Sequence, residues 1–106
     1  MTETTPDIQS LHETWLNQIR AWEKEFDAMD QENGHNMEQA ATKEDKKKVE
    51  HFQNQFIIQK GRLDQMKHNI KIYGGDVEKG SQELSDYETY LNELKDEFEA
   101  FCNKFS

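Results

Sequence analysis

The sequence contains little cysteine, proline and glycine, and each shortage excludes a class of structure. Cys102 is the single cysteine among 106 residues, so no disulfide can form within the chain. Small secreted domains with so few apolar residues normally carry several disulfides, and the first residues show neither the basic nor the apolar segment of a secretory signal. One proline and five glycines are too few for the turns of a β-rich domain. We therefore expect a helical, cytoplasmic protein in which Cys102 is an inert, buried thiol near a helix end.

Apolar residues and positive charges are also scarce. Apolar side chains make up 33% of the chain, and no run approaches the roughly 18 residues that a membrane span needs. Asp and Glu number 22 against 13 Lys and Arg, which gives a formal net charge of −9. Phosphate binding needs clustered positive charge, so this balance argues against nucleic acid as a ligand. We predict that the protein binds neither membranes nor nucleic acid.

Apolar residues in the first third of the chain recur at helical spacing. From Ile8 to Met29 they stand three or four positions apart and so share one face of a helix. Asn33-Gly34 suits the end of this helix, because glycine adopts the left-handed conformation of a helix C-terminus without strain. The pattern predicts a first helix over residues 7–32.

A second repeat begins at Val49 and alternates spacings of three and four. Its positions are apolar except for Gln59. A buried Gln59 would fix the helix register through a hydrogen-bond partner, whereas an exposed one would lie at the margin of the seam. Thr42 and the acidic residues after it resemble a capping box, and Asn36 offers an earlier start. The second helix is therefore expected to begin near residue 36 or 42 and to end at residue 73, before two glycines.

A third repeat runs from Leu84 to Phe105. Its helix begins near Asp76, where Val77 keeps the same register, or near Ser81, and it ends near residue 104.

Three helices of similar length joined by short polar turns should pack antiparallel. We predict an all-α fold, an antiparallel up-down-up three-helix bundle with heptad packing, in which residues 1–106 form a single domain. The expected core comprises Leu11, Trp15, Ile19, Trp22, Phe26, Phe52, Phe56, Leu63, Met66, Ile70, Leu84, Tyr87, Leu91, Leu94, Phe98 and Phe101.

The net charge changes sign along the chain. It is −6 over residues 1–34, +3 over residues 35–75 and −6 over residues 76–106. A basic helix between two acidic ones predicts ion pairs across the helix interfaces, and the two acidic helices should meet mainly through the core. Exposed pairs contribute at most about 1 kcal/mol each, so their expected role is to disfavour wrong partners and registers.

Three isoleucines of the second helix fall outside its main apolar stripe. Ile58 and Ile72 stand two heptads apart with Gln65 between them and form a second, narrower row, while Ile57 lies on the far side again. Such residues either widen the core face of a helix that touches two neighbours or form a contact strip for another chain. Leu16 of the first helix could extend either surface. Our candidate partner-binding residues are therefore Ile57, Ile58, Ile72 and Leu16.

Motifs for catalysis and metal binding are weak or missing in the sequence. The Glu-x-x-His spacing of di-iron bundles occurs once, at Glu32 and His35, where we expect a turn. Phosphate loops and nucleophile elbows do not occur, and most carboxylates fall on polar helix faces. We predict no enzymatic activity, no metal, no cofactor and no small-molecule substrate.

Three heptad helices within 106 residues, with a tryptophan midway along the first, resemble a spectrin-type repeat. The third helix departs from that pattern, because Leu94 and Phe98 stand where such repeats usually carry a tryptophan. The resemblance implies an architecture and no particular activity. We expect a non-enzymatic module for protein–protein interaction or self-assembly. The alternative is an acidic inhibitor or immunity-type protein that blocks a basic surface on its partner.

Overall fold

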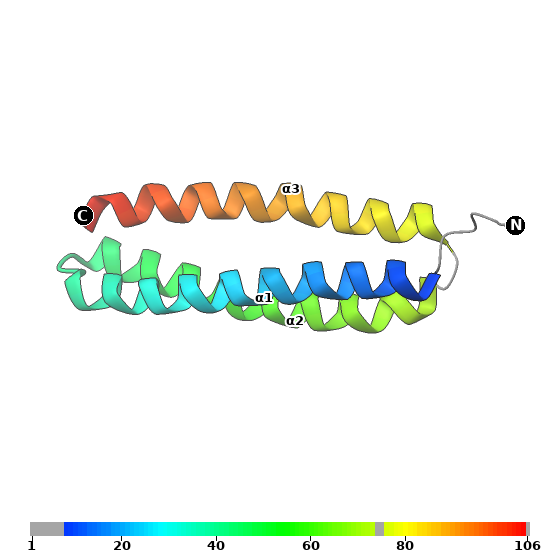
Figure 1. Cartoon of the computed structure of the whole chain (residues 1–106). Helices are drawn as coiled ribbons and strands as arrows, with labels where there is room; N and C mark the ends of the chain where they lie inside the picture. The colour runs from blue at the N-terminus through cyan, green and yellow to red at the C-terminus, as the bar shows by residue number, and fades with distance from the viewer. Residues whose placement is uncertain (1–7, 74–75, 106) are drawn as a thin grey trace, which may run out of the picture.

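The computed structural model describes residues 8–73 and 76–105, which form three long antiparallel helices (Figure 1). They are α1 (Ile8–Gln39), α2 (Lys43–Tyr73) and α3 (Val77–Cys102), followed by a short 3-10 helix, η1 (Asn103–Phe105). α2 returns beside α1, and α3 runs in the same direction as α1. The predicted all-α, up-down-up three-helix arrangement is confirmed.

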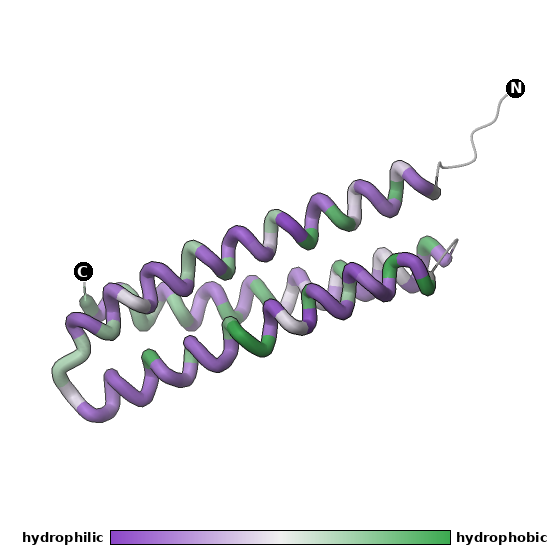
Figure 2. The backbone as a smooth tube through the Cα atoms, turned by 90° about the horizontal axis from the view of Figure 1, so that it is seen from below, coloured by the Kyte–Doolittle hydropathy of each residue, from purple (hydrophilic) through white to green (hydrophobic). Residues whose placement is uncertain are grey.

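The molecule is a rod of 65 × 22 × 18 Å. Its radius of gyration is 17.4 Å, against about 13 Å expected for a compact domain of this length. α1 and α2 approach each other most closely, and α3 lies along the pair (Figure 1). Hydrophobic residues recur in short bands along all three helices, as periodic amphipathic sequences require (Figure 2). None of the helices in the described ranges is long and apolar enough to cross a membrane.

The core follows the predicted heptad stripes. Every expected core residue is buried except Leu11, which packs partly buried against the cluster, and Met29, Ala40 and Val49 join it. Aromatic rings fill its centre: Phe52 lies 5.2 Å from Phe98 and 6.1 Å from Phe56 between ring centroids. Such offset and edge-to-face contacts add to the stabilisation from burial alone.

The end of α1 differs from the prediction. α1 continues through Asn33 and Gly34 to Gln39, because residues 26, 29, 33, 36 and 40 keep the three-four register and point inward. The Asn33 amide donates to the Val49 carbonyl at 2.9 Å, and the Asn36 amide donates to Cys102 Sγ at 3.2 Å. These tertiary contacts outweigh the unfavourable helix propensity of one glycine, about 1 kcal/mol.

The structure decides both open helix starts. Thr42 caps α2, since its hydroxyl accepts a hydrogen bond from the Asp45 backbone N–H at 3.1 Å, so the later start is correct. Asp76 caps α3 by accepting from the Lys79 N–H at 3.1 Å, so the earlier start is correct. The α-helical part of α3 ends at Cys102, and η1 completes the predicted span. The predicted stop at Gly74-Gly75 lies outside the described residues.

Candidate partner-binding surfaces

A row of exposed, uncharged residues runs along the outside of α2. Ile58 and Ile72 belong to it and keep 58% and 77% of their surface exposed. All its members are exposed and stand three or four positions apart, and none is Asp, Glu, Lys or Arg. We call this the outer row of α2; it consists of His51, Asn54, Ile58, Gly61, Gln65, His68 and Ile72. Since one residue in three of the whole chain is charged, this surface is unusually poor in charge.

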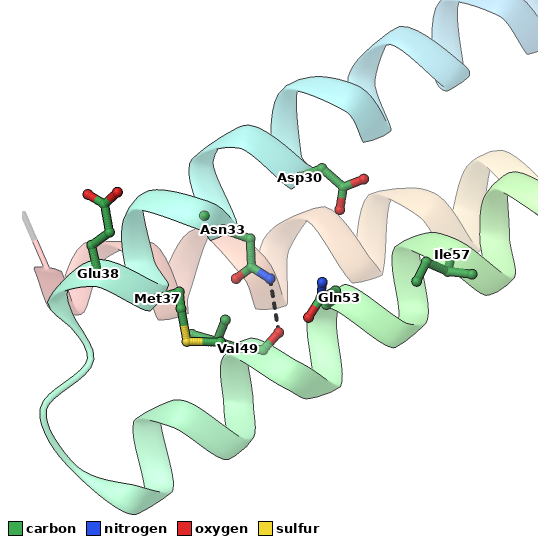
Figure 3. A pocket seen from close by; sticks show the side chains of 8 residues that line it. Asp30, Asn33, Met37, Glu38, Val49, Gln53 and Ile57 are labelled. Carbon is green, nitrogen blue, oxygen red and sulfur yellow. Dashed lines mark hydrogen bonds between the residues drawn. The ribbon is translucent and has the colours of Figure 1, made fainter.

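Ile57 lies on a different surface, a groove of about 570 Å³ between α1 and α2. From α1 the groove is lined by Asp30, Asn33, Gly34, Met37 and Glu38. From α2 it is lined by Val49, Gln53 and Ile57. Figure 3 shows these side chains, with Met37 and Ile57 toward opposite ends. We call this site the α1–α2 groove.

The centre of the α1–α2 groove combines apolar and polar surface. Val49 is buried, whereas Met37 and Ile57 are exposed by 39% and 61%. Asn33 is only 3% exposed; its amide nitrogen holds the Val49 carbonyl, while its Oδ1 is buried without a hydrogen-bond partner (Figure 3). Nothing lies within 4 Å of the position that a Cβ would take on Gly34. The groove is therefore open at Gly34 and has an unused acceptor in its wall.

Carboxylates border the same groove. Asp30 accepts a hydrogen bond from Lys60 Nζ at 2.7 Å, and Asp27 forms a second ion pair with this ammonium at 2.9 Å. Hydrogen bonds to Asp30 and then to Asp27 raise the pKa of Lys60 above its ordinary value. Glu38 is exposed at the end of the groove near the α1–α2 turn. Two carboxylates thus share Lys60, and Glu38 adds a third negative charge farther along the groove.

Leu16, the fourth candidate residue, is partly buried and packs against the core. That Leu16 extends a contact surface stays a prediction, as does partner binding by the three isoleucines. The structure does not bring the four together: Ile58 and Ile72 share the outer row, Ile57 lines the groove, and Leu16 belongs to α1.

The ion pairs agree only in part with the predicted pattern. α2 pairs with α1 as expected, since Lys67 Nζ lies 2.9 Å from Glu23 and Lys60 bridges two α1 carboxylates. Between α2 and the C-terminal segment the charges are the opposite of those expected. The basic residue is Lys104 of η1, and it pairs at 2.6 Å with an acidic residue of α2, Asp45. Lys95 of α3 also reaches Glu25 of α1 at 2.7 Å, so these two acidic helices meet through an ion pair as well as the core.

Cys102 is the last residue of α3 and is half-buried rather than fully buried. Burial raises the pKa of its thiol, while the hydrogen bond from Asn36 acts in the opposite direction. A raised pKa disfavours the thiolate, the reactive form. In the described residues, no group of three or more His, Cys, Asp or Glu side chains could hold a metal ion. Glu32 and His35 lie within α1 and not in the turn where we expected them.

The sequence predicts only part of the outer row of α2, namely Ile58, Gln65 and Ile72. The sequence does not predict the α1–α2 groove, because the predicted first helix stops before Asn33-Gly34 and so lacks the last turns of α1. The signal was present, since Asn33, Asn36 and Ala40 continue the three-four register of the apolar stripe. No family model, no curated protein and no solved structure matches the chain.

Proposed function

We propose that the protein is a non-enzymatic protein–protein interaction module, which binds a helix of a second copy or of another protein through the outer row of α2. The observation that supports this proposal is the exposure of Ile58 and Ile72, two heptads apart, within a row without charged side chains. The three-four repeat is the spacing by which one helix packs along another. Covering both isoleucines would remove apolar surface from water, at roughly 25 cal/mol for each Å².

The first test is the solution mass, measured by light scattering behind a sizing column with reductant present. A dimer or larger species identifies the partner as a second copy, and a monomer identifies it as another protein. The double variant Ile58→Asp with Ile72→Asp should then abolish the dimer, or the recovery of that partner from extracts, while circular dichroism shows an intact fold.

A matched control adds the same two charges elsewhere, through Thr89→Asp and Asn92→Asp on the exposed side of α3. This control should associate as the wild type does. Unchanged oligomeric state and unchanged partner recovery in the Ile58/Ile72 variant would refute the proposal.

We also propose a cytoplasmic location, because the single cysteine of the chain is a free thiol and a reducing compartment keeps it so.

A second candidate function is that of an acidic inhibitor that covers a basic surface. The observation that favours it is a set of exposed carboxylates on α3: Glu78, Asp86, Glu88, Glu93, Asp96, Glu97 and Glu99. Binding by these carboxylates would weaken steeply as salt is added, because exposed charges are screened. Binding through the outer row of α2 would change little with salt, so a titration over ionic strength separates the two functions.

A further inference from the structure

We propose that the α1–α2 groove is a second binding site, which takes a basic amphipathic helix of another protein and seats one of its aliphatic side chains between Met37 and Ile57. This inference rests on the proposed function, since both treat the chain as a protein-binding module. It assigns a different face of the molecule and a partner of defined chemistry.

The apolar surface of the groove has the extent of a short helical contact. On α2 its lining extends from Val49 to Ile57, which corresponds to about 12 Å or two helical turns. Val49 is buried beneath it, and Met37 and Ile57 remain exposed toward its two ends (Figure 3). Methionine is flexible and polarisable, so its side chain can adapt to an incoming apolar group.

Gly34 keeps this groove open at a cost to α1. Glycine within a helix is less favourable than alanine, and nothing in the chain occupies the space that a Cβ would take at this position. Gly80 differs, because the Trp15 indole fills the corresponding space there. Packing against Trp15 therefore explains why position 80 is a glycine. No contact within the chain explains the glycine at position 34, whereas the close approach of a helix from another protein would explain it.

The buried Oδ1 of Asn33 is an independent sign of a missing donor. The other atom of this amide is bound to the Val49 carbonyl, and Oδ1 lacks a partner although Asn33 is 97% buried. A buried acceptor without a hydrogen bond is costly, so native structures usually supply one. A side-chain or backbone N–H of the bound helix would supply this donor once the side chains that cover the oxygen move.

Charge complementarity selects a basic helix as the occupant. The described residues that line the groove include two carboxylates, Asp30 and Glu38, and no lysine or arginine. Asp30 shares the Lys60 ammonium with Asp27, so this cluster retains one net negative charge, and Glu38 adds another. A second copy of this chain carries a net charge of −9, so a separate basic helix is the better match to this rim. A helix with lysine or arginine beside an aliphatic residue matches both the rim and the centre of the groove.

The test uses an amphipathic helical peptide built only from leucine and lysine, titrated into the full chain and followed by amide and methyl NMR. The signals of Gly34, Met37 and Ile57 should shift together. Gly34→Leu fills the groove and should weaken binding by about tenfold or more. The control variant Ala28→Leu also adds a leucine at an exposed helix position of α1, outside both the groove lining and the outer row of α2, and should bind as the wild type does.

Neither substitution changes the charge of the protein, so general electrostatic attraction would be equal in all three proteins. Equal affinity of wild type and Gly34→Leu, or shifts confined to the carboxylates of α3, would overturn the inference. If a peptide of leucine and glutamate binds as tightly as the peptide of leucine and lysine, the inference that the partner helix is basic would be overturned. If Gly34→Leu fails to fold, Gly34→Ala provides the milder obstruction.

The two proposals fail separately. If the Ile58→Asp, Ile72→Asp variant loses association while Gly34→Leu leaves peptide binding unchanged, the proposal for the outer row is supported and the proposal for the groove is overturned. A dimer that Gly34→Leu dissociates would place a second copy in the groove and overturn the basic partner.

Discussion

Three amide side chains occupy core positions of the heptad repeat, and each joins a different pair of helices. Asn33 links α1 to α2 through the Val49 carbonyl, and Asn36 links α1 to α3 through Cys102. Gln59 links α2 to α3 by donating to the Tyr90 hydroxyl at 3.3 Å. A shifted register would leave these buried groups without partners, so the amides favour one alignment of the three helices. Gln59 is thus buried with a hydrogen-bond partner rather than exposed at the margin of the seam, and its register-fixing role stays a prediction.

The Gln59 contact leads to a prediction about stability. Tyr90→Phe removes the acceptor of the buried Gln59 amide and also the hydrogen bond that the hydroxyl donates to Gln55 Oε1, and should destabilise the fold by about 1–3 kcal/mol. Gln59→Leu removes the whole amide, including an Oε1 that already lacks a partner, and should cost clearly less. Urea denaturation of the two variants measures the difference. Equal destabilisation by both would show that the hydrogen bond contributes nothing specific.

Glycines at three helix positions should respond differently to alanine. At Gly80 a Cβ would meet the Trp15 ring, so Gly80→Ala should destabilise by about 1–3 kcal/mol. Gly34 and Gly61 have open space, so Gly34→Ala and Gly61→Ala should each stabilise by about 0.5–1 kcal/mol. Thermal unfolding of the three variants tests the assignment. A stabilised Gly80→Ala would contradict the packing of Trp15 against α3.

At the scale of elements, the helices and their core were predictable because the signal is local. Apolar spacing of three and four identifies each helix and its buried face without knowledge of the neighbours. The end of α1 was not predictable in the same way, since Asn33 and Asn36 are held by residues 16 and 66 positions away. A local rule, glycine as a helix stop, was therefore overruled by tertiary contacts. The α1–α2 groove was not predicted for the same reason, because the last turns of α1 form one of its walls.

The helix caps provide a prediction with an internal control. Thr42→Ala and Asp76→Ala each remove a side chain that accepts a backbone N–H at a helix start, and each should cost about 0.5–2 kcal/mol. Thr14→Ala is the matched control. Its hydroxyl donates to the Ser10 carbonyl within α1 and caps no helix start, and alanine is the better helix former. Chemical denaturation should show Thr14→Ala to be neutral or stabilising; a comparable loss there would mean that capping is not the cause.

For the whole molecule, exposure was only partly predictable from sequence. Ile58 and Ile72 stand outside the main stripe in the sequence, and the structure leaves both exposed. The groove depends on how two helices pack, which a single helical pattern does not contain. The change of net charge from one helix to the next likewise predicted pairing between α1 and α2, but the reversed pair of Asp45 with Lys104 depends on where η1 ends against α2.

That reversed pair predicts the acid limit of stability. The hydrogen bond from Lys104 holds the pKa of Asp45 below its ordinary value of 3.8. A lowered folded-state pKa means that the stabilisation is fully present above pH 3.8 and is lost as pH falls through the lowered value. Asp45→Asn should therefore unfold at lower urea concentration than wild type near neutral pH, and the difference should vanish well below pH 3.8. A difference that persists in strong acid would assign the effect to packing or to the Thr42 cap.

The lysines that join α2 to α1 should determine how stability falls at alkaline pH. Hydrogen bonds to Asp30 and Glu23 raise the pKa of Lys60 and Lys67 above 10.5, so their stabilisation is fully present below pH 10.5 and is lost as pH rises through the raised values. Lys60→Met and Lys67→Met should each cost at most about 1 kcal/mol near neutral pH, because both pairs are partly solvated. Lys47→Met, at an exposed position of α2, is the control and should be close to neutral. Urea unfolding curves from neutral to strongly alkaline pH should show these variants converging with wild type above pH 10.5. Variants that stay equally destabilised there would show that the aliphatic stems, and not the charges, hold α1 against α2.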